Sequence, residues 1–119
     1  MFPYSRQSIY KKDILSVVRV LKSDFLTQGP LVNKFEKKIL NYVKAKYAVA
    51  TNSGSSALHI ACLALNLKKG DLVWTVPNTF AATANCALHC GAKVDFVDID
   101  KNTWNMSIQS LEKKLQKEK

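Results

Sequence analysis

The chain has 119 residues, of which 47% are hydrophobic and 23% charged, as expected for one folded domain with a real core. Its apolar runs are shorter than a membrane span and its start lacks the apolar stretch of a signal peptide, so we expect a cytoplasmic protein with no membrane partner. The net charge is +9, but the lysines are spread along the chain rather than clustered with arginine and aromatic residues, so we expect no nucleic-acid partner.

Two amphipathic helices are predicted in the first part of the chain. Between residues 11 and 23, apolar side chains recur at the spacing of one helix face. Gly29 then breaks the helix, and Pro30 suits the first turn of a second one, which the apolar pattern extends to about Lys44. We interpret residues 1–45 as an N-terminal helical arm.

From residue 46 onward the pattern changes, and strands alternate with helices. Short apolar stretches at 47–51, 72–76 and 94–99 are typical of buried strands. Helical patterns cover 55–65, 79–89 and 108–117, and Ser107 is the expected cap of the last helix. This order predicts an α/β fold with a mostly parallel sheet flanked by helices. Because three strands are half of a typical doubly wound sheet, we expect an incomplete fold in which residues 46–119 are the first part of a larger domain.

The three cysteines, Cys62, Cys86 and Cys90, are an odd number of thiols, which favours reduced side chains. Together with the two histidines they could be metal ligands, but their spacing matches no CxxC pair and they fall in apolar helical patterns. We therefore expect them to be small buried residues, and we expect no metal site.

The polar turn from Asn52 to Ser56 follows the first predicted strand and precedes a helix. Ligands of open parallel sheets bind at this edge, and the free N–H groups of a helix N-terminus suit a phosphate. Gly54 leaves room for close approach, and Ser55 and Ser56 offer N–H and hydroxyl donors. The GxGxxG and GxxxxGK signatures of nucleotide sites are absent. The alternative is that one serine caps the helix and the others have no role.

A second turn, "VPNTFAAT", follows the next predicted strand at the same edge of the sheet. Phe80 lies there, where a core aromatic residue is less expected, and its flat face could stack on a ring. The two turns together favour a phosphorylated aromatic cofactor. The alternative is that Phe80 packs beneath its loop.

Four stretches carry a resemblance to a known family: "FLTQGPLVNKFEKKI", "AVATNSGSSALHIACLAL", "VPNTFAATANCALHCGAKVDFVDID" and "NTWNMSIQSLEKKL". In this order they resemble the N-terminal part of the DegT/DnrJ-type sugar aminotransferases. The opening 30 residues are most similar to the transaminases of pseudaminic acid synthesis. The resemblance implies a fold-type I enzyme that uses pyridoxal 5'-phosphate (PLP) and forms a homodimer.

The resemblance also implies roles for individual residues. The backbone of Ser55 and Ser56 would hold the PLP phosphate beside Gly54, and Phe80 would stack on the pyridine ring. The residues that would touch a nucleotide-sugar are Tyr4, Asp24, Phe25, Leu26, Thr27 and Gly54.

The reaction implied by the resemblance moves an amino group, from glutamate, to the C4 ketone of a UDP-linked 4-keto-6-deoxy-N-acetylhexosamine for surface-glycan synthesis. No lysine here matches the family's lysine motif, and its pyridinium-binding carboxylate is also absent, so we expect no catalytic residue in this chain and no transamination by it alone. A PLP-dependent sugar dehydratase, a non-catalytic anion-binding module and a basic nucleic-acid-binding domain remain as alternatives.

Overall fold

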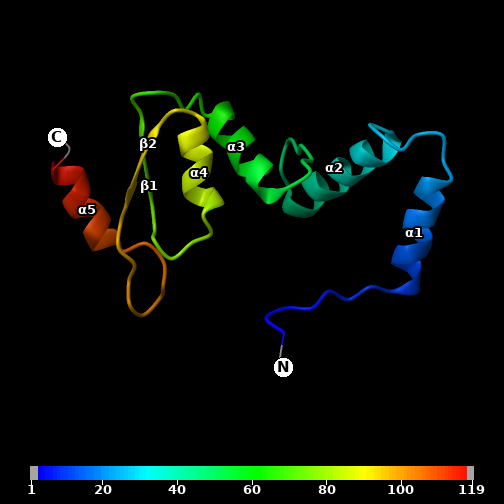
Figure 1. Ribbon diagram of the computed structural model, residues 1–119, viewed down its shortest axis with the longest axis horizontal. Coiled ribbons are helices and arrows are strands. Elements are labelled where there is room, and N and C mark those ends of the chain that lie inside the picture. The colour runs from blue at the N-terminus through cyan, green and yellow to red at the C-terminus, as the bar shows by residue number, and fades with distance from the viewer. Residues whose placement is uncertain (1–2, 118–119) are drawn as a thin grey trace. The chain divides into compact units, whose positions relative to one another are not determined.

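The computed structural model describes residues 3–117, and the chain divides into two compact units, Met1–Ala50 and Thr51–Lys119. None of the helices in the described range is long and apolar enough to cross a membrane. Figure 1 labels the helices and strands along the chain.

The first unit contains α1 (Lys11–Leu21) and α2 (Pro30–Val43), both at the predicted places. The backbone N–H of Tyr10 donates to the carboxylate of Asp13 at 2.9 Å, which satisfies a free group at the start of α1. Gly29 precedes α2, and a Cβ placed there would lie 2.9 Å from the Cβ of Phe25, so the turn is too tight for a side chain.

The strand predicted at residues 47–51 is wrong, because these residues are not assigned to any strand. The N–H of Ala50 donates instead to Oε1 of Glu36 on α2 at 2.9 Å. A strand requires ladder hydrogen bonds to a neighbouring strand. Here a side-chain acceptor satisfies the backbone donor in place of such a neighbour.

The second unit is a parallel α/β arrangement, in agreement with the predicted fold class. Its elements are α3 (Gly54–Ala64), β1 (Leu72–Thr75), α4 (Ala82–His89), β2 (Lys93–Phe96) and α5 (Ile108–Lys117). Strands β1 and β2 pair in parallel from Leu72 opposite Lys93 to Thr75 opposite Phe96. Helix α4 connects the two strands and packs on both, while α3 packs on α4 (Figure 1). This is the crossover geometry that parallel strands require.

Small residues form the buried core around α4. The side chains of Ala82, Cys86 and Ala87 are buried on the helix, and Val97 is buried directly after β2. Such short side chains allow a helix to lie close to its neighbours. The predicted helix at 79–89 begins later than expected, at Ala82, because its first residues form the turn after β1.

Helix α5 is joined to the sheet by an ion pair between Lys114 and Asp95 of β2. Ser107 caps this helix as predicted, since the N–H of Ser110 donates to its Oγ at 3.2 Å. The hydrogen bond from Lys114 and a second one from the N–H of Phe96 hold the pKa of Asp95 below its ordinary value.

Replacing Lys114 with glutamine should raise the pKa of Asp95 toward its ordinary value, because the strongest group that favours the charged carboxylate is lost. The folded-state pKa of Asp95 lies below the unfolded value of about 3.9, so the pair stabilises the fold above that pH and is lost as the pH falls through the folded pKa. An NMR titration of the Asp95 carboxyl carbon measures the shift. Lys113→Gln, at an exposed neighbour on α5, is the control, and an unchanged Asp95 pKa in Lys114→Gln would contradict the assignment.

Candidate functional site

The polar turn before α3 is held by hydrogen bonds among its own side chains. Ser53 is the N-cap, and its Oγ accepts the N–H of Ser56 at 3.1 Å. The hydroxyl of Ser56 donates to Oδ1 of Asn52 at 3.0 Å, and the hydroxyl of Thr51 donates to the carbonyl of Ser53 at 2.8 Å. One serine therefore caps the helix, as in the alternative interpretation, and three further polar side chains shape the turn.

Two backbone N–H groups of this turn are available to a ligand. In the part of the chain that the structure describes, the N–H groups of Gly54 and Ser55 have no hydrogen-bond partner, and both residues are exposed. A Cβ added to Gly54 would meet nothing within 4 Å, so the space beside its Cα is open. A helix N-terminus with free N–H groups and a partial positive charge suits an anion.

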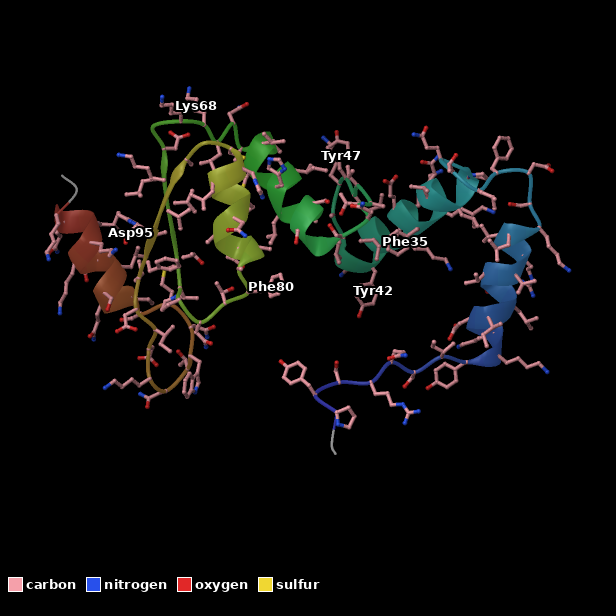
Figure 2. All side chains as sticks on the ribbon, viewed as in Figure 1. Phe35, Tyr42, Tyr47, Lys68, Phe80 and Asp95 are labelled. Atoms are coloured by element: carbon pink, nitrogen blue, oxygen red, sulfur yellow. The ribbon has the colours of Figure 1, made fainter. Side chains whose placement is uncertain are left out.

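Phe80 lies in the turn before α4 and is exposed. Its side chain retains 78% of its accessible surface, so the alternative that it packs beneath the loop is wrong. Figure 2 shows the ring projecting from the end of α4 where the helix begins. An exposed aromatic face at this position is available for stacking on a planar ligand.

Ser55 and Phe80 line one pocket of about 210 Å³ within the second unit. The remaining lining residues come from α4 and the turn before it: Ala81, Ala82, Asn85, Cys86 and His89. The pocket therefore combines a side chain at the open helix N-terminus with an aromatic ring. This combination fits the phosphate and the ring of PLP. Gly54 and Ser56 lie in the same turn but outside the pocket lining.

The residues expected to touch a nucleotide-sugar are only partly brought together. Asp24, Phe25 and Leu26 line a pocket of about 500 Å³ in the first unit, between α1 and α2. Thr27 and Tyr4 are exposed and do not line it. Arg19, Ser16 and Ser23 contribute its other polar side chains. No pattern in the sequence marked these three residues, because they belong to the exposed side of an ordinary amphipathic helix and its following turn.

The pocket around Phe80 also contains residues that sequence reasoning missed. Asn85 and His89 are four residues apart on α4, a spacing that places them on one helix face and that could have identified them. The ring of His89 lies 5.5 Å from that of His59 on α3, at an angle of 52°.

The cysteines lie where α3 and α4 meet. All three are free thiols, and burial together with the neighbouring Cys86 and Cys90 raises the pKa of Cys62 to about 11. Within residues 3–117, no group of three or more His, Cys, Asp or Glu side chains is placed to hold a metal ion.

Comparisons with known proteins place the chain in a family. The model of the DegT/DnrJ/EryC1/StrS aminotransferase family matches residues 7–119. A UDP-4-amino-4,6-dideoxy-N-acetyl-beta-L-altrosamine transaminase of Campylobacter jejuni is 47% identical over 118 residues, which are 99% of this chain and 31% of that protein.

Two solved structures are similar over most of the chain. Spr1654 from Streptococcus pneumoniae, a candidate sugar aminotransferase solved in its PLP form, matches with a TM-score of 0.89 and 30% identity over 94% of this chain and 29% of its own. An E. coli GDP-4-keto-6-deoxy-D-mannose-3-dehydratase with bound hydrated PLP matches with a TM-score of 0.88 and 31% identity, over 95% of this chain and 31% of its own. Both descriptions include PLP, the cofactor expected from the sequence. The chain spans about three tenths of the length of the curated relatives that it matches.

Replacing Ser53 with alanine should lower the free energy of unfolding of the full chain by about 1 kcal/mol, because the start of α3 loses its cap. The neighbouring Ser55→Ala is the matched control, since the Ser55 hydroxyl makes no hydrogen bond within the described part of the chain. Urea unfolding measures both. Equal decreases in the free energy of unfolding of Ser53→Ala and Ser55→Ala would show that Ser53 is not the cap.

Proposed function

The chain belongs to the DegT/DnrJ/EryC1/StrS aminotransferase family, and we propose that its residues 46–119 contribute the first part of the cofactor-binding domain of a PLP-dependent nucleotide-sugar aminotransferase. The enzyme transfers an amino group from glutamate to the C4 ketone of a UDP-linked 4-keto-6-deoxy-N-acetylhexosamine, for surface-glycan synthesis of the pseudaminic acid type. The observation that carries this proposal is the single pocket that Ser55 and Phe80 share.

The phosphate of the cofactor is held at the start of α3. The free N–H groups of Gly54 and Ser55 donate to its oxygens, and the helix dipole favours its negative charge. The N–H of Ser56 now donates to a neutral hydroxyl. A phosphate oxygen can replace that acceptor, because hydrogen bonds to charged groups are stronger than those to neutral ones.

Phe80 covers one face of the cofactor ring and excludes water from it. When bound, PLP supplies an electron sink that allows an amino group to pass between an amino acid and a ketone. Among the described residues, no lysine lines the pocket, and we propose that residues 1–119 alone do not transaminate.

The substrate side of the proposal concerns the first unit. Tyr4 and the segment from Asp24 to Thr27 contact the nucleotide-sugar, and Gly54, a residue of the second unit, is also assigned to it. The pocket that Asp24, Phe25 and Leu26 line supports this assignment, since it offers both apolar and polar lining. By the same resemblance, the full protein is a cytoplasmic homodimer.

A sugar dehydratase is the second candidate, because one structural neighbour is described as a dehydratase with bound PLP. Incubation of the full-length enzyme that contains this chain with PLP, glutamate and a UDP-4-keto-6-deoxy-N-acetylhexosamine distinguishes the two. We expect a UDP-linked 4-amino sugar by mass spectrometry, formed only when glutamate is present. A product that has lost a hydroxyl as water would favour the dehydratase, and no binding of PLP would overturn both.

Replacing Phe80 with alanine should weaken PLP binding by the full chain roughly 2- to 12-fold, as expected for the loss of one aromatic stacking contact. Phe80→Tyr keeps the ring and should bind PLP normally. Tyr42→Ala removes an exposed aromatic residue of α2 and serves as the control. Titration of the cofactor-free protein, followed by the absorbance of PLP, measures the affinities. Equal affinities of Phe80→Ala and the control would contradict the stacking role.

A further inference from the structure

The pocket that Ser55 and Phe80 share has few polar side chains. Asn85 and His89 are the others in its lining, and the rest of the lining is alanine and cysteine. Ligand pockets of this kind are mostly apolar, and a small number of polar groups fixes the orientation of the ligand. Each polar side chain in the lining is therefore a candidate for contact with the cofactor.

Asn85 is exposed, and its side-chain amide has no hydrogen-bond partner within residues 3–117. It follows Phe80 by five residues and lies in the first turns of α4. Its donors and its acceptor are thus free, in the same pocket lining as the Phe80 ring, which Figure 2 shows near the start of α4. An amide that has no structural partner and lines a pocket is available to a ligand.

His89 is a weaker candidate on the same wall. It lies four residues beyond Asn85, which at about 1.5 Å per residue places it about 6 Å farther along the helix from Phe80. Its ring is also already in contact distance of the His59 ring, with centroids 5.5 Å apart. Because Asn85 lies nearer to Phe80 than His89 does, Asn85 is the stronger candidate for contact with the cofactor.

We propose that the side-chain amide of Asn85 is a further cofactor-binding group, which hydrogen-bonds a polar substituent of the pyridine ring; this inference rests on the proposed function. The amide can donate and accept, so it suits a ring hydroxyl or a carbonyl oxygen. Ser55 is at the phosphate end of the pocket, and Asn85 therefore fixes the rotation of the ring against Phe80. It carries no charge and does not add to the attraction for the phosphate.

The test uses the cofactor-free full chain and three probes: PLP, pyridoxal without its phosphate, and inorganic phosphate. Asn85→Ala should weaken the binding of PLP and of pyridoxal by the same factor, roughly 2- to 12-fold, as expected for one neutral hydrogen bond. Its affinity for inorganic phosphate should not change. Titrations followed by absorbance, or by competition with PLP for phosphate, give the three constants.

Gln109→Ala, which removes an exposed amide side chain of α5, is the matched control and should bind all three probes normally. Asn85→Asp keeps the size of the side chain but removes its NH₂ donors and adds a negative charge, so it should bind PLP more weakly than the unmodified chain does. This variant covers the case in which Asn85→Ala does not fold.

Three results would overturn the assignment: normal PLP affinity in Asn85→Ala, a loss confined to inorganic phosphate, or a loss in His89→Ala instead. Each of these leaves the proposed function in place, because the unmodified chain still binds PLP. If the unmodified chain binds no PLP, both the assignment and the proposed function fail. Equally weakened binding of PLP and of pyridoxal in Asn85→Ala supports both the Asn85 assignment and the proposed function.

Discussion

The hydrogen bond from the N–H of Ser56 to Oγ of Ser53 sets where α3 begins in the structure, and the proposed site is built on that helix start. It ends the extended segment and begins α3 at Gly54, so that the N–H groups of Gly54 and Ser55 have no partner among residues 3–117. A helix must leave its first N–H groups unsatisfied unless side chains or ligands meet them. In this turn the Ser53 side chain accepts the N–H of Ser56, and the N–H groups of Gly54 and Ser55 remain available to an anion.

The pocket that Ser55 and Phe80 share also requires that α3 and α4 lie close together. Short side chains on α4 make this possible, since Ala82, Cys86 and Ala87 are buried along the helix and α3 packs against it. As a consequence, the start of α3 and the turn before α4 contribute to one pocket, although Ser55 and Phe80 are 25 positions apart. Larger residues at the buried positions would separate the helices and with them the two halves of the site.

Local signals in the sequence predicted much of this fold. Pro30, the cap at Ser107 and the apolar spacing of the helices act over a few residues, and the structure has each of them at the expected place. The strand at 47–51 was mispredicted because a strand depends on a partner far away in the sequence, and Ala50 bonds to Glu36 instead. The turn at Gly54 and the exposure of Phe80 could be predicted, since polar caps and unexpected aromatics are visible locally. Asn85 was missed because its importance depends on which face of α4 meets the pocket.

The packing of α3 on α4 also affects the thiols beside the proposed cofactor pocket. A thiol reacts as the thiolate, so its protonation decides its reactivity. Burial and the neighbouring thiols raise the pKa of Cys62 to about 11, which disfavours its thiolate. Cys86 lines the pocket, but it is buried and its S–H donates to the carbonyl of Thr83 at 3.1 Å. The same packing that brings α3 and α4 together therefore also buries Cys86 and places thiols next to Cys62.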